Sequence, residues 1–392
     1  MMKKDENHAF DDVLKHHKDY KVQIIYTQVD RDAKNAPHFT QFNYQLNPKQ
    51  YFYCASMVKL PTCAIALERL NKLNINGLDY NTRLSIDSIN ACEPKVKLDA
   101  LSDINYPSIG TYIKKMLLVS DNDAFNRGYD FLGPDYLYKR MYQSGYFYAR
   151  IDQRYAGCGL EENHITPGFK FYNTTGSVIY SQPDSTHVTL YQYPFAKEML
   201  VGKGFYDDDT HTIKEPKDFE YSNFLPLENV QDILMSLIFP NSVPSYQHFD
   251  LKPEQYKLLQ QYMSEYPQES YFKEYHDTSY YPAYKKYYFY GRKRNAVIDT
   301  NIRIFNIVGR AYGFLSDVAY VVDFKNNIEF FLSAVIYTNK NGILNDDKYE
   351  YDTIGYPFFV NLSKMIYNYE KLRKRPHAPD LKEFKLDYTA NK

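Results

Sequence analysis

Strand-like alternation of apolar and polar residues marks the first fifty positions of the chain. Residues 20–29 (YKVQIIYTQV) are rich in β-branched side chains and alternate in polarity, which predicts a strand. Shorter runs at residues 39–46 and 51–54 predict two further strands. Residues 9–18 have the spacing of a short amphipathic helix. The N-terminal part therefore predicts one helix followed by strands.

From residue 56 to about residue 300 the pattern changes to helices separated by long polar loops. Apolar positions three and four apart are typical of helices that bury one face. This spacing predicts helices at residues 56–73, 109–119, 134–144, 227–239 and 253–266. A weaker helical period appears near residues 193–200, and the tyrosine-rich stretch at residues 271–290 follows no clear period.

Three strand-like runs follow one another in the last hundred residues, at 300–308, 316–323 and 329–337. Their short connections predict an antiparallel meander. Residues 355–372 then carry an apolar stripe at helical spacing and predict a closing helix.

Strands at both ends of the chain, with helices between them, indicate one sheet built from both termini. We predict an α/β fold: an antiparallel sheet flanked by N- and C-terminal helices, with an inserted, mostly helical lobe. A single domain then spans residues 1–392, with the α/β part at about 9–60 and 300–372 and the lobe at about 61–299.

Composition narrows the classes of partner. The chain has 392 residues, 44% hydrophobic and 24% charged, which is typical of a globular protein. A net charge of −1 without a basic run argues against nucleic acid as a partner. The sequence contains no run of 18 apolar residues, so we expect no membrane span. The cysteines and histidines show no metal-ligand spacing, and we expect no metal and no cofactor.

Two short motifs carry candidate chemistry. Ser56 and Lys59 stand three positions apart at the head of a predicted helix, which puts both side chains on one face. A lysine beside a serine hydroxyl can take its proton and activate the oxygen for attack on a carbonyl. Taken alone, the pair is more often a helix cap and a solvent-facing lysine than a catalytic pair. The second motif, Ser120-Asp121-Asn122, follows the helix predicted at 109–119.

Ser-x-x-Lys-Leu-Pro opening one helix, Leu-Leu-Val-Ser-Asp-Asn ending another, and the C-terminal meander together resemble the serine β-lactamase and penicillin-binding-protein superfamily, and more narrowly the class A β-lactamase-like serine hydrolases. The resemblance implies that Ser56 is the acylated nucleophile and that Lys59 activates it. It also implies that Ser120 relays a proton to the leaving group and that Asn122 holds the substrate's amide carbonyl. We expect burial and nearby positive charge to keep Lys59 neutral.

The third motif of this family, Lys-Thr-Gly on a strand, is altered here to Ile307-Val308-Gly309. Gly309 would let substrate approach the strand, and the backbone N–H groups of Ser56 and Arg310 match the family's oxyanion hole. The cation that meets a substrate carboxylate is missing at Ile307. By strand alternation Arg310 should point away and Arg303 should share the face, about 13 Å along the strand. Neither is a clean replacement.

A second departure concerns the hydrolysis of the acyl-enzyme. Class A enzymes carry a glutamate that activates water, and its position falls on Tyr155 here, or on Ala156 if the register slips. Glu161 and Glu162 follow, but loop positions do not transfer by proximity alone. We therefore expect no efficient penicillinase.

Two functions remain open at this point. The first is a serine hydrolase or acyltransferase that acts on an amide, lactam or ester of a small-molecule or cell-wall-derived substrate. The second is a non-catalytic binding protein on the same scaffold. Family members usually work outside the cytoplasm, and residues 1–8 lack a signal-peptide core. We expect a periplasmic or secreted protein whose leader is missing from this chain, and a cytoplasmic one otherwise. The oligomeric state stays open.

Overall fold

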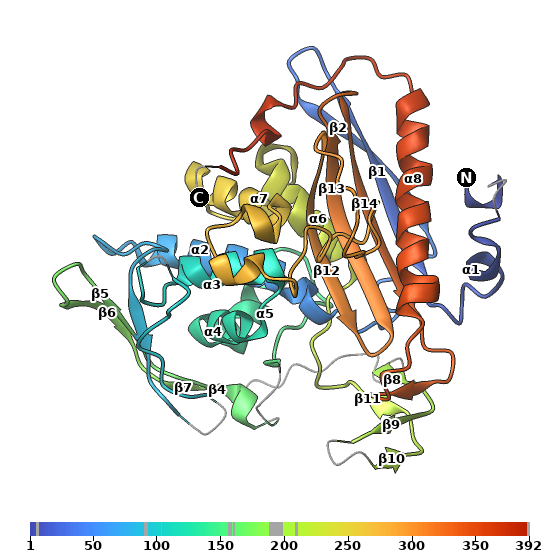
Figure 1. The fold of residues 1–392 in the computed structure, drawn as a ribbon. Coiled ribbons are helices and arrows are strands. Elements are labelled where there is room, and N and C mark those ends of the chain that lie inside the picture. The colour runs from blue at the N-terminus through green and yellow to red at the C-terminus, as the bar shows by residue number, and fades with distance from the viewer. Residues whose placement is uncertain are drawn as a thin grey trace.

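The computed structural model describes residues 1–4, 8–89, 93–102, 104–155, 159, 161–187, 199–207 and 211–389. Its main element is a five-stranded antiparallel sheet with the strand order β12-β13-β14-β1-β2. The strands are β1 (Gln23–Arg31), β2 (Pro37–Tyr44), β12 (Ile302–Ala311), β13 (Phe314–Asp323) and β14 (Ile328–Tyr337). Both ends of the chain thus contribute to one sheet, and β12 forms one of its edges (Figure 1).

Helices cover both faces of this sheet, which explains why every residue of β13 and β14 is buried. On one face lie α8 (Tyr356–Leu372) and α1 (Asp11–Lys15), whose apolar side chains join those of the sheet in one core cluster. The opposite face packs against α6 (Leu227–Ile238) and α7 (Pro253–Ser264) (Figure 1). Strands buried on two sides have few polar positions, and their sequence reads as a nearly continuous apolar run.

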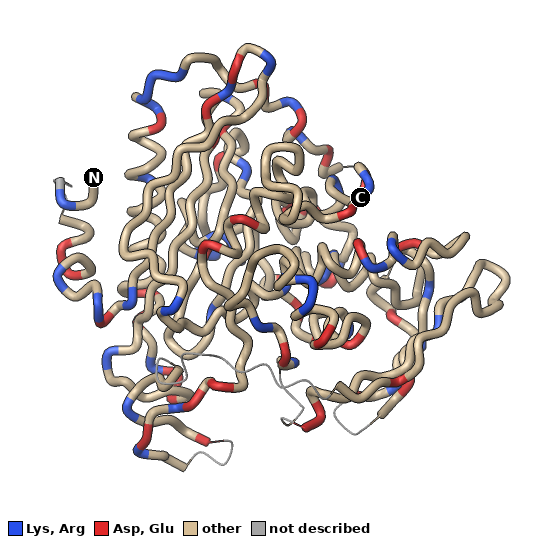
Figure 2. Tube along the Cα trace, turned by 180° about the vertical axis from the view of Figure 1, so that it is seen from behind, with Lys and Arg blue, Asp and Glu red and all other residues tan. Residues whose placement is uncertain are grey.

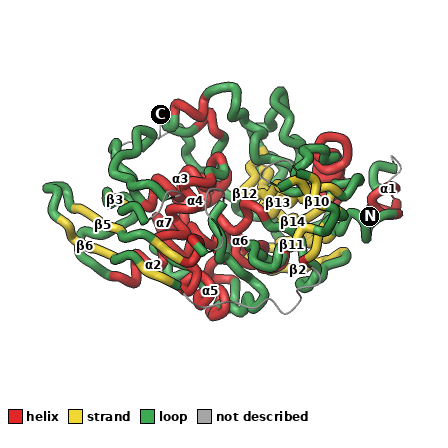
Figure 3. The backbone as a smooth tube through the Cα atoms, turned by 90° about the horizontal axis from the view of Figure 1, so that it is seen from below, coloured by secondary structure: helices red, strands yellow, loops and turns green. Residues whose placement is uncertain are grey.

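The remaining long helices gather beside the sheet, as Figure 3 shows from below. They are α2 (Lys59–Leu73), α3 (Ile109–Val119), α4 (Asn122–Leu132) and α5 (Pro134–Gln143). α2 lies at the centre of this lobe, where it contacts the other three, and eleven of its fifteen residues are buried. Such a helix is apolar around most of its circumference, because it has neighbours on nearly every side.

Short strands decorate the lobe and the lower end of the sheet. A three-stranded sheet joins β3 (Leu84–Ile86), β5 (Phe169–Tyr172) and β6 (Val178–Gln182). The other short strands are β4 (Ile165–Thr166), β7 (Ser185–Thr186), β8 (Leu200–Val201), β9 (Gly204–Tyr206), β10 (Thr212–Ile213), β11 (Lys217–Asp218) and β15 (Ile343–Leu344). Single helical turns lie at Met2–Lys4, Ala55–Val58, Glu162–His164, Pro240–Ser242, Ser245–Gln247, Pro267–Glu269, Lys273–His276, Tyr351–Gly355 and Lys382–Phe384.

The predicted fold class, an antiparallel sheet with flanking helices and a mostly helical lobe, is confirmed. The strand predicted at residues 51–54 is wrong. This segment is an irregular, buried connection in which Tyr51 packs its ring against Phe219 and Phe224, so its apolar character reflects aromatic packing. Helix α4 was not anticipated. Most of the helical period near 193–200 lies outside the described residues.

Charged residues of both signs are interspersed over the described part of the molecule (Figure 2). None of the helices described is at once long enough and apolar enough to cross a lipid bilayer.

Strand β12 comes very close to the chain that precedes α2, and Gly309 makes this approach possible. A Cβ atom at Gly309 would lie 2.6 Å from the carbonyl oxygen of Cys54 and 2.5 Å from Ser316 Oγ. No side chain fits in that space. The backbone of β12 can therefore lie directly beside the turn Ala55–Val58.

We predict that Gly309→Ala lowers the free energy of unfolding by about 1–3 kcal/mol, the usual cost of overpacking, as measured by urea denaturation. Ser316→Ala is the control. Its hydroxyl is buried without a hydrogen-bond partner, so removing it should cost little. Combining the two changes should not restore stability, because the clash with the Cys54 carbonyl remains. Full rescue by Ser316→Ala would contradict this explanation.

Candidate active site

The turn Ala55–Val58 presents Ser56 at the start of α2. Ala55 has the left-handed φ of 46°, which is strained for a residue with a side chain. Ser56 follows, partly accessible, and Lys59 is the first residue of α2 and fully buried. Because one helical turn separates them, the two side chains lie on the same face. The strained residue thus directly precedes the candidate nucleophile.

The amine of Lys59 lies among four oxygen atoms. Its Nζ is 2.9 Å from Ser56 Oγ and 3.1 Å from Ser120 Oγ. It is also 2.5 Å from the Ser120 carbonyl oxygen and 2.7 Å from Asn122 Oδ1. The structure therefore brings together four of the residues predicted from the two motifs, with Lys59 at their centre.

Burial lowers the pKa of Lys59 to about 7. The Asp121 carboxylate opposes this shift, and the nearby Lys285 adds to it. A substantial fraction of the amine is therefore neutral at neutral pH, and a neutral amine has a lone pair with which to accept a proton from Ser56.

The second motif is the joint between α3 and α4. Ser120 ends α3 with a left-handed φ of 63°, and Asp121 caps α4 by accepting a hydrogen bond of 2.8 Å from the N–H of Ala124. Asn122 is the first residue of α4. The sharp turn explains how Ser120 and Asn122 both reach Lys59 while Asp121 satisfies the helix.

A pocket of about 290 Å³ opens in front of Ser56. Motif residues, β12 and the chain between α7 and β12 line it: Ser56, Val119, Ser120, Asn122, Tyr284, Lys285, Tyr287, Arg292, Val308 and Arg310. The site thus has the open access that a reacting molecule needs.

Strand alternation holds on β12, but Ile307 does not face the pocket, so it is Arg310 and not Arg303 that lies at the site. Arg310 lines the pocket, with its guanidinium 5.4 Å from the Tyr351 ring. Arg303 instead pairs with Glu269 at 2.6 Å and does not line the pocket. Ile307 is buried in the core on the lobe side, while Val308 faces the pocket. From β12 only Val308 and Arg310 line the pocket, so the position of Ile307 is not a cation site.

Tyr155 occupies the space beside Lys59. Its ring lies 5.4 Å from Lys59 Nζ, and its hydroxyl donates a hydrogen bond to the carbonyl of Ala55. The side-chain oxygen of Asn126 accepts from the N–H of Tyr155 at 2.8 Å. Burial raises the pKa of Tyr155 well above its usual value, so its hydroxyl stays protonated and is a poor base. Ala156 lies outside the described residues.

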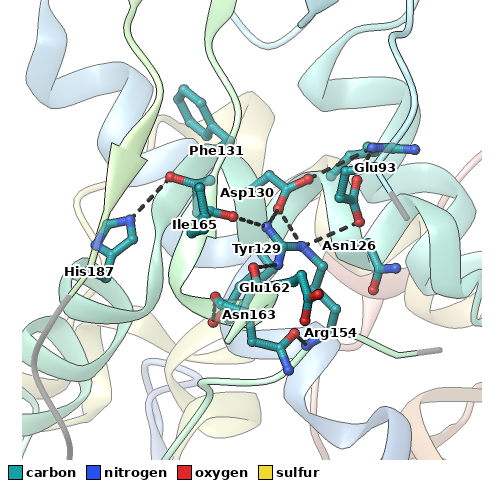
Figure 4. A network of polar contacts seen from close by, with 12 residues as sticks. Glu93, Asn126, Tyr129, Asp130, Phe131, Arg154, Glu162, Asn163, Ile165 and His187 are labelled. Carbon is teal, nitrogen blue, oxygen red and sulfur yellow. Dashed lines mark hydrogen bonds and ion pairs between the residues drawn. The ribbon is translucent and has the colours of Figure 1, made fainter. Parts of the chain in front are cut away.

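A buried ionic network fixes the chain just before Tyr155 (Figure 4). The side chains of Arg154 and Asp130 are both completely buried, and Arg154 Nε is 2.7 Å from Asp130 Oδ1 and 3.3 Å from Glu93 Oε1. The guanidinium also donates to the carbonyl of Glu162 at 2.8 Å. Neither Glu161 nor Glu162 lines the pocket. Asp130 has a pKa raised by burial and lowered by Arg154.

Four pocket residues were not anticipated from the sequence: Tyr284, Lys285, Tyr287 and Arg292. All lie in or just after the tyrosine-rich stretch, whose lack of periodicity gave no basis for placing them. The sequence feature that could have indicated them is the pair of adjacent lysines, Lys285 and Lys286, among aromatic residues, which is unusual for a surface loop.

A larger groove of about 1290 Å³ lies elsewhere and contains none of the motif residues. Two of its charged groups, Arg140 and Glu68, pair with each other at 2.6 Å. The described residues include no group of three His, Cys, Asp or Glu side chains arranged to hold a metal ion.

Comparisons with known proteins agree with this architecture. Residues 7–175 match the model of the β-lactamase enzyme family. Solved structures similar to this chain include β-lactamases from Sphaerobacter thermophilus (12% identity, TM-score 0.49, 94% of this chain and 97% of the other), Burkholderia ambifaria (13%, 0.46, 88% and 94%) and Vibrio parahaemolyticus (13%, 0.45, 92% and 99%). These scores are too low to inform on activity. No curated protein matches the sequence.

The family match over residues 7–175 and the observed topology support a β-lactamase-like fold, which is the fold that the motifs had indicated.

We predict that Arg154→Met lowers the free energy of unfolding by about 3–5 kcal/mol, because it leaves a buried carboxyl without its main partner. Urea denaturation of this variant measures the loss. The control is Lys170→Met, which removes an ion pair with Asp87 at an accessible position and should cost less than about 1 kcal/mol. Equal effects of the two changes would contradict a structural role for the network.

Proposed function

We propose that this protein is a serine hydrolase or acyltransferase that forms an acyl-enzyme at Ser56 with an amide, lactam or ester substrate. One observation carries the proposal: the buried amine of Lys59, with a pKa near 7, lies within hydrogen-bonding distance of both Ser56 Oγ and Ser120 Oγ beside an open pocket. A surface lysine and a helix cap would not have this arrangement.

In the proposed reaction, neutral Lys59 takes the proton of Ser56 while Ser56 Oγ bonds to the substrate carbonyl carbon. The backbone N–H groups of Ser56 and Arg310 stabilise the oxyanion. When the bond to the leaving group breaks, the proton passes from Lys59 through Ser120 to the departing nitrogen or oxygen. Asn122 holds the substrate's amide carbonyl, and Arg310 beside Gly309 on β12 meets an anionic part of the substrate.

Tyr155 favours a long-lived acyl-enzyme. In the sequence it matches the position of the glutamate that activates water in class A enzymes, with Ala156 as the alternative register, and its protonated hydroxyl is already donated to the Ala55 carbonyl. Among the described residues that line the pocket, no carboxylate is present to activate water near Ser56. The acyl group would pass to a better nucleophile or hydrolyse slowly, so we propose acyl transfer or slow hydrolysis of a small-molecule or cell-wall-derived substrate in preference to penicillin destruction.

The second candidate is a binding protein without catalysis. Two departures favour it, namely Ile307 in the third motif and Tyr155 in place of glutamate. The contacts of Lys59 with Ser56, Ser120 and Asn122 favour the enzyme, because a pure binding site has no need of a neutral buried amine beside a hydroxyl.

We predict that a penicillin or an active-ester probe adds covalently to Ser56, and that the rate of addition rises with pH through about 7 and then levels off. The neutral form of Lys59 is the active base, and its fraction grows as pH passes its pKa. Intact-protein mass spectrometry at a series of pH values measures the rate.

Ser56→Ala and Lys59→Met should both abolish the adduct, whereas Ser245→Ala, at an exposed position away from the pocket, should leave it unchanged. The absence of an adduct with both probes would favour the binding protein.

We also predict that Tyr155→Phe leaves the rate of deacylation within about threefold of the wild type, since a lost general base would instead cost about 10²–10⁴-fold. The decay of the adduct measured by mass spectrometry tests this expectation. Adding an amine nucleophile should speed the decay in both proteins. A deacylation rate that collapses in Tyr155→Phe would show that the tyrosine itself activates water.

A further inference from the structure

The chain between α7 and β12 reaches the candidate site at residues 284–292, and a buried polar clamp holds it there. The side-chain N–H of Asn306, on β12, donates to the carbonyl of Lys285 at 2.8 Å. The same group donates to Asp317 Oδ1, on β13, at 2.8 Å. Asp317 Oδ2 in turn accepts from the N–H of Tyr287 at 3.2 Å. Asn306 and Asp317 have no exposed surface.

Burying this clamp is energetically unfavourable unless its polar groups are hydrogen-bonded. Two fully buried polar side chains in the middle of a sheet replace apolar packing, and they are tolerable only because each is hydrogen-bonded. Their partners are the backbone groups of Lys285 and Tyr287. The sheet therefore fixes the backbone on either side of Lys286, and with it the direction in which Lys285 leaves the chain.

Lys285 points from this clamp toward the candidate site. It lines the same pocket as Ser56 and Ser120, and its amine donates to the carbonyl of Leu117 in the last turn of α3. The side chain is almost completely buried. Since Ser120 ends α3, the lysine braces the turn that carries the Ser120 hydroxyl, and it sets a second amine near that of Lys59.

Its neighbour Lys286 is also buried but has different partners. Lys286 Nζ donates to the carbonyls of Met263 and Ile304 and to Asn306 Oδ1, at 2.7–2.8 Å, and it does not line the pocket. Two adjacent buried lysines thus have separate partners, one toward the site and one within the core. This contrast provides a matched control.

We propose that Lys285 is a positioning residue of the site: it braces the Ser120 turn and, from the segment before β12, places a second amine beside that of Lys59. The inference rests on the proposed function, since it describes how the same site is tuned.

Several ionisable groups surround the two amines. Asp121 and Cys63 act on Lys59 together with Lys285, while Cys63 and Asp317 act on Lys285. Arg292 and Arg310 add positive charge at the pocket. Burial lowers the pKa of Lys285 to about 7, so Lys285 carries its positive charge mainly below that pH, where this charge lowers the pKa of Lys59. Removing the charge of Lys285 should therefore raise the pKa of Lys59. A smaller neutral fraction of Lys59 then remains at any pH below that pKa.

The test compares Lys285→Gln, Lys285→Arg and Lys286→Met by the pH dependence of Ser56 acylation with an active-ester probe. Lys285→Gln keeps a donor for the Leu117 carbonyl without the charge. The acid limb, meaning the rise of the acylation rate with pH below its plateau, should move up by about one pH unit in this variant. At pH 6.5 the variant should then be acylated about tenfold more slowly than the wild type, and above pH 9 its rate should approach the wild-type rate. Lys285→Arg keeps the charge, so its acid limb should stay in place or move down. Lys286→Met should lose thermal stability without moving the limb.

The outcomes separate the two proposals. If the wild type forms no adduct on Ser56, the proposed function fails. If the wild type reacts but Lys285→Gln has an unshifted acid limb, or a rate lowered equally at every pH, the role of Lys285 is overturned while the acyl-enzyme stands. A limb that moves up in Lys285→Arg, or as far in Lys286→Met, overturns it as well. If Lys285→Gln does not fold, the Lys285→Arg profile decides.

Discussion

The rest of the site depends on the removal of one amine from water. Lys59 is completely buried, yet its Nζ has four oxygen atoms within 3.1 Å. An ammonium group in such a place loses its hydration, and the balance shifts toward the neutral amine. The four oxygens hold the amine in position, and all of them belong to neutral groups: two hydroxyls, a side-chain amide and a backbone carbonyl. Position and protonation state are thus set by the same burial.

Four parts of the fold meet to create that environment. The turn before α2 provides Ser56, the first residue of α2 is Lys59, and the tight α3–α4 joint brings in Ser120. Strand β12 closes the third side, where Gly309 permits backbone contact with the start of the α2 segment. The Tyr155 ring lies beside Lys59, and its hydroxyl donates to the Ala55 carbonyl. The preceding residue, Arg154, anchors this segment through its contact with Asp130. Each part contributes backbone geometry as much as side-chain chemistry.

The sequence was informative where local rules determine structure. The spacing of Ser56 and Lys59, the meander and the closing helix follow from short-range periodicity, and the structure agrees with them. The contacts of Ser120 with Lys59 required knowledge of a family. Residues 51–54 were misread because buried aromatic packing in an irregular segment has the same composition as a strand.

Long-range placement accounts for the remainder. Lys285 comes from a stretch without periodicity, and only the clamp by Asn306 and Asp317 brings it to the pocket. Alternation along β12 showed that Arg310 and Ile307 face opposite sides of the strand, but it did not show which of the two sides borders the pocket. These are tertiary effects, and no window of local sequence contains them.

The most direct test of this account is the titration of Lys59 itself. Carbon-13 NMR of protein labelled at lysine Cε, with the Lys59 signal assigned by its absence from Lys59→Arg, follows the protonation of this one amine. The account predicts a midpoint near pH 7 in the unliganded protein. A midpoint near 10.5, the ordinary value for a solvated lysine, would contradict it and with it the activation of Ser56.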